Sequence, residues 1–214
     1  MKGWLITLEG PEGGGKSTQI ALLQEYLKQA GIPCTVVREP GGTAIGDRIR
    51  GILLDPLATD MAVRTEILLY AASRAQVVEQ VILPALRRGE VVLCDRFVDS
   101  SIAYQGFGTP WDREEVREVN RMATGGLRPD RTYLLDVPVE ESIRRLQKRG
   151  RETDRIEQKG RSYHERVRQG FLHLARREPD RFLVVDARRP IQEVFRVLKG
   201  DLEQLISLSR EGEA

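Results

Sequence analysis

A glycine-rich segment near the start of the chain has the residues and the spacing that bind nucleotide phosphates. It fits the pattern G-x-x-x-x-G-K-S/T and consists of Gly10, Pro11, Glu12, Gly13, Gly14, Gly15, Lys16, Ser17 and Thr18. The glycines allow the backbone to curl so that successive N–H groups point inward at phosphate oxygens. We expect Lys16 to reach the β- and γ-phosphates of ATP, and the Ser17 hydroxyl to bind Mg²⁺. The whole segment is therefore predicted to hold ATP and Mg²⁺.

A second candidate for phosphate chemistry follows a short apolar run at residues 91–94, which is typical of a buried strand. Asp95 and Arg96 come directly after this run. At the carboxyl edge of a parallel sheet, the Asp95 carboxylate can hold a metal ion directly or through water. The planar guanidinium of Arg96 can bridge the phosphates of a donor and an acceptor. The alternative is a surface ion pair, so this interpretation depends on the glycine-rich segment nearby.

A turn signal follows another apolar run, in the sequence Arg-Glu-Pro-Gly-Gly-Thr at residues 38–43. Proline and two glycines favour a tight, exposed turn, which leads here into a helix that bears Arg50. The functional interpretation places this segment, with Arg38 and Glu39, over an acceptor nucleotide. The simpler alternative is a turn without a function.

Tyr70 and Arg74 are four residues apart in a helical stretch and therefore share one face. An aromatic ring that stacks on a base, beside an arginine that hydrogen-bonds its edge, would make a base pocket. On spacing alone, however, a core tyrosine and a surface arginine are favoured. Residues 100–106, Ser-Ser-Ile-Ala-Tyr-Gln-Gly, add further polar and aromatic groups shortly after Arg96.

The elements that must position these residues are short apolar runs that alternate with longer helical patterns. We expect strands at residues 4–8, 34–38, 91–94, 132–135 and 182–185. We expect helices at residues 17–30, 65–80, 139–148 and 191–208, with Pro84 starting or kinking a further turn. This alternation predicts an α/β P-loop NTPase fold, with a five-stranded parallel sheet, helices on both faces and a short lid. Ligands of such sheets bind at the carboxyl ends of the strands.

The totals limit the classes of protein that need to be considered. The chain has 214 residues, 40% of them hydrophobic, which predicts a single domain over residues 1–214. A net charge of +2 is small for a nucleic-acid binder, so we expect no nucleic-acid partner. Cys34 and Cys94 lie in apolar runs and are expected to be buried hydrophobic residues. No apolar run is long enough to span a membrane, and we expect a soluble, cytoplasmic protein without a membrane partner.

Taken together, these segments resemble thymidylate kinases. The resemblance rests on motifs that run in family order over nearly the whole chain, at residues 8–18, 38–43, 70–75, 95–97, 100–106 and 154–157. It implies an enzyme that converts dTMP and ATP with Mg²⁺ to dTDP and ADP, on the pathway to dTTP. It also implies a homodimer.

The resemblance further implies roles for individual residues. Glu12 would be the loop carboxylate near the 3′-hydroxyl of the acceptor sugar, and Arg96 would contact the phosphates. Tyr70 would stack on thymine, and Arg74 would face the carbonyl edge of the base. Another group would contact the nucleoside or the phosphate of dTMP: Ser101, Tyr104, Gln105, Arg38 and Arg50. Within this group, Tyr104 would crowd the 2′ position of the sugar and so favour deoxyribose.

Members of this family carry a catalytic basic residue either inside the phosphate loop or on the lid. The loop here has no basic residue before its lysine, so the resemblance implies the bacterial type, with a lid at about residues 144–160. Residues 144–155 include six basic residues, of which Arg149 or Arg151 is the candidate for catalysis. Arg145 and Arg149 are alternatively expected to flank the adenine of ATP. For about half of this run, a solvated helix face is the simpler interpretation.

Other proteins with a phosphate loop supply the rival interpretations. The chain lacks the Asn-Lys-x-Asp base reader of GTPases and the Leu-Ser-Gly-Gly-Gln segment of transporter ATPases. Three rivals remain: a kinase for adenylate, guanylate or uridylate, a synthetase that activates a carboxylate with ATP, and a nucleotide-binding switch with negligible turnover. Activity with a panel of nucleoside monophosphates would separate them, because each predicts a different acceptor or none.

Overall fold

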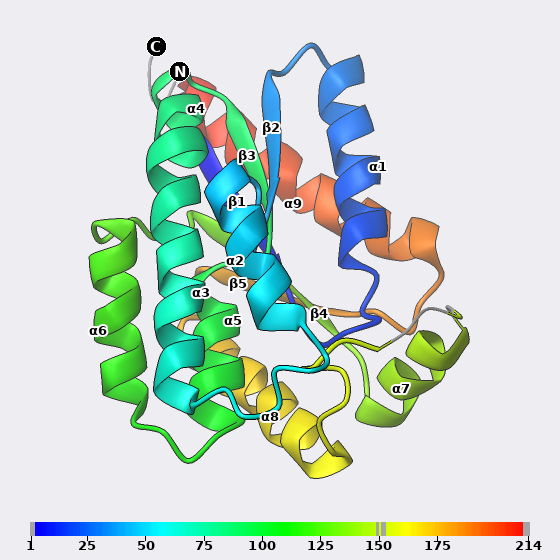
Figure 1. The fold of residues 1–214 in the computed structure, drawn as a ribbon. Helices are drawn as coiled ribbons and strands as arrows, with labels where there is room; N and C mark the ends of the chain where they lie inside the picture. The colour runs from blue at the N-terminus through cyan, green and yellow to red at the C-terminus, as the bar shows by residue number, and fades with distance from the viewer. Residues whose placement is uncertain (1–2, 149, 151–152, 212–214) are drawn as a thin grey trace.

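The computed structural model describes residues 3–148, 150 and 153–211. A five-stranded sheet runs through the middle of the fold, and all of its strands are parallel (Figure 1). Its order is β2–β3–β1–β4–β5, and the strands are β1 (Trp4–Glu9), β2 (Cys34–Arg38), β3 (Val91–Asp95), β4 (Arg131–Asp136) and β5 (Phe182–Asp186). The predicted five-stranded parallel sheet is therefore confirmed.

The register of the sheet brings several predicted site residues to one edge. Asp95 at the end of β3 lies opposite Leu8 of β1 and opposite Arg38, the last residue of β2. Parallel strands end at the same edge, so the glycine-rich loop after Glu9 begins beside Asp95. β1, β3 and β5 each extend one charged residue further than predicted, and β4 extends by one charged residue at each end, because a hydrophobic pattern cannot mark a carboxylate or an arginine as part of a strand.

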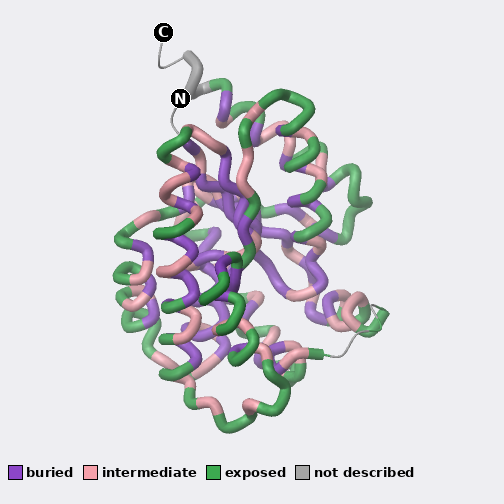
Figure 2. Tube along the Cα trace, turned by 45° about the horizontal axis from the view of Figure 1, so that its top comes forward, coloured by how far each residue is buried: buried purple, intermediate pink, exposed green. Residues whose placement is uncertain are grey.

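Helices cover both faces of the sheet, as predicted. The helical elements are α1 (Lys16–Gln29), α2 (Ala44–Leu54), α3 (Val63–Val77), η1 (Val78–Ile82), α4 (Leu83–Arg87), α5 (Val98–Ser101), η2 (Ile102–Phe107), α6 (Arg113–Thr124), α7 (Val139–Lys148), α8 (Arg161–Arg177) and α9 (Ile191–Glu211), of which η1 and η2 are π-helical. On one face, α1 and α9 pack on Ile6 and Leu8. On the other face, α3, η1 and α4 pack around Leu5, and α8 and η2 pack around Leu134. The sheet is the buried centre of the molecule in Figure 2.

The helix predicted at residues 65–80 does not run on as one α-helix. After α3 the chain makes the π-helical turn η1 and then continues as α4, whose second residue is Pro84. The Leu83 N–H bonds to the carbonyl of Val78, five residues earlier. Proline lacks an N–H, and its ring clashes with the carbonyl four residues before it, so the wider turn accommodates Pro84. The prediction that Pro84 marks a further turn is confirmed.

The structure also contains helices that the sequence patterns did not reveal, namely α6, α8 and the pair α5 and η2. In α6 the buried residues are Val116, Asn120 and Thr124, so two of the three are polar and the stripe is not apolar. Within the described residues, no helix combines the length and the apolar character that crossing a membrane requires. Cys94 is buried as predicted, whereas Cys34 is only half-buried because β2 is an edge strand.

Candidate active site

The glycine-rich loop wraps around the start of α1, and its glycines adopt conformations that other residues avoid. Gly10 and Gly15 have φ angles of 131° and 88°. A Cβ on Gly10 would lie 2.4 Å from the carbonyl oxygen of Leu135, so a side chain there would clash with β4. The Lys16 ammonium donates hydrogen bonds to the carbonyls of Gly10 (3.1 Å) and Pro11 (3.0 Å). The loop is therefore closed over its own lysine.

Burial changes the charge behaviour of Lys16. Burial is the largest influence and the Arg96 cation the next; together they lower the lysine pKa to about 8, although Glu12 opposes the shift. A cation that is easily neutralised and close to another cation is stabilised by any anion that enters between them. The loop is thus prepared electrostatically for phosphate.

Ser17 and Asp95 meet in front of the loop, as the predicted metal site requires. The Ser17 hydroxyl donates a hydrogen bond of 3.1 Å to Oδ2 of Asp95. Ser17 is exposed and Asp95 is half-buried, so both oxygens face the pocket opening. One hydroxyl and one carboxylate are ligands that suit Mg²⁺, which normally keeps several waters and binds substrate phosphates as well.

Arg96 lies at the centre of the pocket and contacts both the loop and its carboxylate. Its Nη1 donates to the Gly10 carbonyl (2.9 Å), and its Nη2 pairs with Oε1 of Glu12 at 2.5 Å. The guanidinium also lies over the ring of Tyr104, 5.0 Å from its centroid. Burial alone would raise the pKa of Glu12, but Arg96 and then Lys16 outweigh it and hold this pKa at about 2. The Glu12 carboxylate is therefore charged at neutral pH.

Arg74 is buried, so the surface arginine favoured by spacing alone is wrong. It is 1% exposed, and its guanidinium donates to Oε2 of Glu39 (2.7 Å) and to the carbonyl of Phe97 (3.1 Å). Its Nη1 also donates to Ser101 Oγ (2.9 Å) and to the amide oxygen of Asn120. Four acceptors take four of the five N–H groups of this side chain. Helical spacing could not show burial that depends on partners from four separate segments.

Tyr104 and Gln105 are on the π-helical turn η2, opposite α3. The Tyr104 hydroxyl donates to Glu12 (3.3 Å), and the Gln105 amide donates to Oε1 of Glu66 (2.9 Å). Burial, as the largest cause, raises the pKa values of both Tyr70 and Tyr104, so both phenols stay protonated at neutral pH. Single π-helical turns are frequent at functional sites, since the wide turn re-aims its side chains.

Two arginines meet at the mouth of the pocket. Arg50 donates from Nη1 to the carbonyl of Pro40 (2.9 Å) and is half-buried, while Arg38 is exposed. Burial lowers the pKa of Arg50 first, and the neighbouring Arg38 lowers it further. The two positive charges repel one another, and an anion that binds between them would reduce this repulsion.

One pocket of about 180 Å³ joins these parts. The predicted residues in its lining are Glu12, Gly13, Gly14, Gly15, Lys16, Ser17, Arg38, Glu39, Arg50, Tyr70, Arg74, Asp95, Arg96, Ser101, Tyr104 and Gln105. The predicted residues Gly10, Pro11, Thr18 and Arg145 are not part of this lining. One concave site thus brings together the phosphate loop, a paired carboxylate and arginine, and several aromatic groups.

Comparison with known protein families decides what kind of site this is. A family model described as thymidylate kinase matches residues 8–197. The chain belongs to the thymidylate kinase family. Its membership confirms the predicted family and the predicted class of enzyme, a nucleoside monophosphate kinase that uses ATP as its phosphate donor. It argues against the synthetase and the switch protein as interpretations.

Individual thymidylate kinases agree with the family match. Proteins of this name from an Exiguobacterium species and from Desulfosudis oleivorans are 52% and 48% identical to the chain. The first match covers 90% of both chains, and the second covers 96% of this chain and 99% of the relative. The crystal structure of a thymidylate kinase from Ehrlichia chaffeensis is similar with a TM-score of 0.77, at 30% identity, over 94% of this chain and 99% of the other. The predicted fold is confirmed.

The lid of this thymidylate kinase family member is described only in part. Arg149 and Arg151, the predicted catalytic residues, lie outside the described residues. On α7, which lies beside the start of α1 in Figure 1, Arg145 donates to the carbonyls of Gly13 (3.2 Å) and Ala187 (2.9 Å). Arg145 is thus at the phosphate loop but outside the acceptor pocket. Within the predicted lid, Asp154 is part of the pocket lining.

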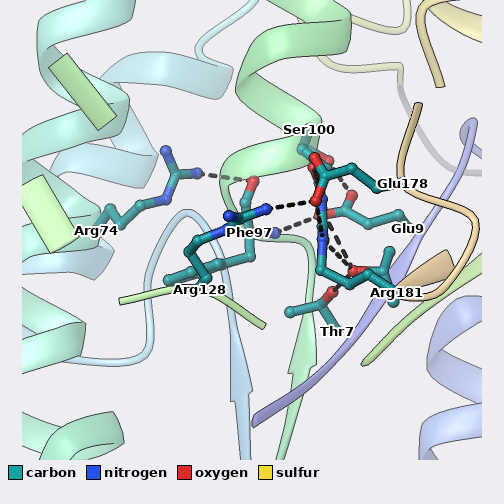
Figure 3. Close-up of polar contacts among 10 residues, drawn as sticks. Thr7, Glu9, Arg74, Phe97, Ser100, Arg128, Glu178 and Arg181 are labelled. Atoms are coloured by element: carbon teal, nitrogen blue, oxygen red, sulfur yellow. Dashed lines mark hydrogen bonds and ion pairs between the residues drawn. The ribbon is translucent and has the colours of Figure 1, made fainter. Parts of the chain in front are cut away.

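Several residues of the site were missed by the sequence analysis. Glu9 (Figure 3) is fully buried behind the phosphate loop. Asp99 accepts hydrogen bonds of 2.7 and 2.9 Å from Arg181. Glu9 had a detectable signal, because it is a carboxylate at the carboxyl end of a predicted strand. Asp99 and Arg181 had none, since the fold alone brings them together.

Proposed function

We propose that the chain phosphorylates dTMP with MgATP, giving dTDP and ADP, as a step toward dTTP. The observation that carries the proposal is the single pocket that holds Lys16, Arg96 and Arg74 in its lining. Lys16 belongs to a loop built for phosphates, and Arg74 lies where a base would enter. Arg96 is between them, in contact with the loop and beside Tyr104. A pocket with these three parts can hold a donor phosphate and an acceptor nucleotide at once.

Ser17 and Asp95 would hold Mg²⁺, with Asp95 acting directly or through water. Their oxygens already lie 3.1 Å apart, and the chemistry of a hydroxyl and a carboxylate fits a hard cation that retains waters. When bound, Mg²⁺ would supply positive charge to the donor phosphates. Loss of ATP-dependent turnover in EDTA, with recovery on adding Mg²⁺, would support this assignment.

Lys16 and Arg96 would neutralise the charge that spreads over the transferred phosphoryl group. A nucleotide phosphate is already an anionic nucleophile at neutral pH, so the reaction needs no general base. The work of the protein is then positioning and charge stabilisation. Within the described residues, Nε of Arg96 has no hydrogen-bond acceptor, which leaves a donor free for a phosphate. Arg38 and Arg50, at the mouth, would hold the dTMP phosphate.

The base side would select thymine. Four N–H groups of Arg74 are taken by protein acceptors, and one hydrogen on Nη2 is left for a carbonyl oxygen of the base. Tyr70 would stack on the ring, with Ser101 and Gln105 closing the pocket. Tyr104, bonded to Glu12, would crowd the 2′ position of the sugar. Glu12 would lie near the 3′-hydroxyl.

The lid, at about residues 144–160, would complete the site on closure. Arg149 or Arg151 would bring a further positive charge to the transferred group, because the phosphate loop has no basic residue before Lys16. Arg145 would lie near the adenine of ATP, at the outer side of the loop. Closure would also exclude water and so limit wasted hydrolysis of ATP.

A homodimer is part of the proposal. Exposed apolar side chains gather on the adjacent helices α2 and α3, where Ile45, Ile52 and Leu68 are each about half exposed. Pairing of these faces across a two-fold axis would bury them. Light scattering should give a dimer mass for the wild type and a monomer mass for a Leu68→Glu variant. A monomer mass for the wild type would contradict the proposal. We expect the enzyme to work in the cytoplasm, on the nucleotides found there.

The function is tested by measuring ADP formation from ATP and Mg²⁺ with dTMP, dUMP, dCMP, dAMP, dGMP, UMP and AMP in parallel. The proposal predicts fast turnover with dTMP and weaker use of dUMP. Preference for another monophosphate would keep the phosphate side of the pocket but overturn the base assignment. Absence of turnover with every acceptor would overturn the proposal.

A further inference from the structure

Glu9 is a buried carboxylate that the mechanism above does not use. It is the last residue of β1, is 0% exposed, and directly precedes the phosphate loop. Its Oε1 accepts a hydrogen bond of 2.7 Å from the Phe97 N–H, and its Oε2 accepts one of 2.5 Å from the Ser100 hydroxyl (Figure 3). Burying a carboxylate is costly, so a residue of this kind in a core requires an explanation.

The Ser100 hydroxyl links Glu9 to the side chain of Arg96. A serine has one proton, and that proton is given to Glu9. The oxygen of Ser100 is therefore free to accept, and it accepts a bond of 3.1 Å from Nη1 of Arg96. The direction of donation is fixed along the chain, from Arg96 to Ser100 and from Ser100 to Glu9. The guanidinium cannot accept, so this order can only be kept while Glu9 is an acceptor.

The other oxygen of Glu9 acts on the backbone of Arg96. Arg96 has a φ angle of 71°, and among the described residues it is the one non-glycine residue in the left-handed region. Such a conformation costs free energy and persists only when the surroundings hold it. The Phe97 N–H, which follows directly, is held by Glu9, while the Arg96 N–H bonds to the carbonyl of Leu8 at 3.1 Å.

We infer that Glu9 is a positioning residue for phosphoryl transfer, which aims the Arg96 guanidinium through Ser100 and fixes the strained Arg96 backbone through Phe97. The inference rests on the proposed role of Arg96 at the phosphates. Glu9 itself touches neither substrate, because it lies behind the loop and outside the pocket lining. Its hydrogen bonds reach the reacting groups through Ser100 and Arg96.

The charges around Glu9 connect this arrangement with pH. Burial, then the Asp99 carboxylate, raise the pKa of Glu9 to about 7, while Arg96 opposes the shift. The Glu9 carboxylate also opposes the lowering of the Lys16 pKa and adds to the raising of the Cys94 pKa. Asp99 is itself held by Arg181. A proton on Oε2 of Glu9 would turn the carboxyl into a donor toward Ser100, so the Ser100 proton would lose its acceptor and the Ser100 oxygen would face two donors, Glu9 and Arg96.

Two substitutions separate the parts of this arrangement. In Glu9→Gln, the amide oxygen can still accept from the Phe97 N–H, which turns the NH₂ group toward Ser100, so that the Ser100 proton loses its acceptor and a second donor competes with Arg96 for the Ser100 oxygen. Ser100→Ala removes the link and changes little volume. Each should lower kcat for dTMP by ~10-fold or more, with KM values for dTMP and ATP changed by less than ~3-fold. The double variant should be no worse than the poorer single variant, because both act along one path.

Thr132→Val is the matched control. Thr132 is equally buried in the neighbouring cluster and accepts a 2.6 Å bond from Arg181, but it has no bond to Ser100 or Arg96. It should lower the melting temperature while leaving kcat within ~2-fold of the wild type, as expected for a site without a path to the reacting groups. Any fall in kcat due to instability alone would appear in this variant too.

The pH profile of kcat gives a readout that a purely structural role would not move. In the wild type, kcat should fall as the pH drops through about 7, where Glu9 gains its proton. Glu9→Gln should lack this limb and show only the titration of the dTMP phosphate.

Wild-type kcat and an unchanged pH profile in both Glu9→Gln and Ser100→Ala would overturn the inference, with the proposed function intact. A wild type inactive with dTMP would instead overturn the proposed function. If Glu9→Gln fails to fold, Ser100→Ala alone decides.

Discussion

The phosphate side and the base side of the pocket are held in place by different kinds of contact. On the phosphate side, Lys16 bonds to backbone carbonyls of its own loop, and Arg96 pairs with a partly exposed Glu12. On the base side, Arg74 and Glu39 form a pair in which each side chain is 2% exposed. The first arrangement leaves charges open for a ligand, whereas the second uses most of its hydrogen bonds inside the protein.

The difference between the two sides predicts which substitutions should lower the rate and which should lower the stability. Removing a charge on the phosphate side takes away stabilisation of the transition state but leaves few buried groups without partners. Removing a partner on the base side leaves a buried charge uncompensated, which destabilises the fold. The two sides should therefore separate into loss of rate and loss of stability or selectivity.

The largest effect is expected from Lys16→Ala. It should lower kcat by ~10³-fold, because one preorganised charge at the transferred group is lost. The melting temperature should change little, since the bonds lost are to two backbone carbonyls and, among the described residues, no charged partner is left without its ion pair. Single-turnover kinetics with dTMP and a thermal melt check both parts. An unfolded variant, or one that keeps wild-type kcat, would contradict the expectation that the phosphate side affects the rate and not the stability.

Arg74→Met should mainly cost stability. Glu39 would be left as a buried carboxylate without its partner, at a cost of about 3–5 kcal/mol in the free energy of unfolding. Urea denaturation measures this cost. The double variant Arg74→Met with Glu39→Gln is the control, because it removes the stranded charge and should recover part of the loss. A double variant less stable than the single one would contradict the role of the pair.

A smaller effect is expected from the pKa of Lys16, which is about 8 in the free protein. Above this pH the lysine loses its proton and its attraction for phosphate, so ATP affinity should fall as pH rises. If the bound state keeps the proton, the Kd for ATP should weaken by about tenfold between pH 7 and pH 9. Titration calorimetry measures it, with a melt at each pH as the control. A constant Kd would show that Lys16 stays charged.

The smallest effect is expected away from both sides. Arg121 and Glu118 form an ion pair on α6 in which both side chains are about two-thirds exposed. Exposed pairs of this kind contribute little, since water and salt screen them. Arg121→Ala should change neither kcat nor the melting temperature measurably. A clear loss of activity would mean that a change on the surface of α6 reaches the pocket through Asn120 and Arg74, which would contradict the expectation that this region affects neither side of the pocket.

The sequence predicted the phosphate side in detail because its signal is local. The loop residues are consecutive, and the strand before them and the helix after them are defined by simple patterns. Asp95 and Arg96 could be placed beside the loop because parallel strands end at one edge, and the register of β1 with β3 confirms this.

The base side could not be predicted from the residues alone. The four acceptors around Arg74 come from the end of β2, the turn after β3, α5 and α6, and no spacing in the sequence links them. Only the family resemblance pointed to Arg74 as a pocket residue. The same reason explains why Asp99 and Arg181 were missed, and why π-helical η2, with Tyr104 and Gln105, was not predicted as a helix.

The most direct test of the central claim compares one arginine from each side, changed in the same way. Arg96→Lys and Arg74→Lys both keep the charge but lose the planar fork. For each variant, kcat/KM is measured with dTMP and with dCMP. The account predicts that Arg96→Lys slows both acceptors alike and preserves their ratio, whereas Arg74→Lys narrows the preference for dTMP. Equal loss of preference in both variants, or in neither, would contradict the division of the pocket into a side that sets the rate and a side that selects the base.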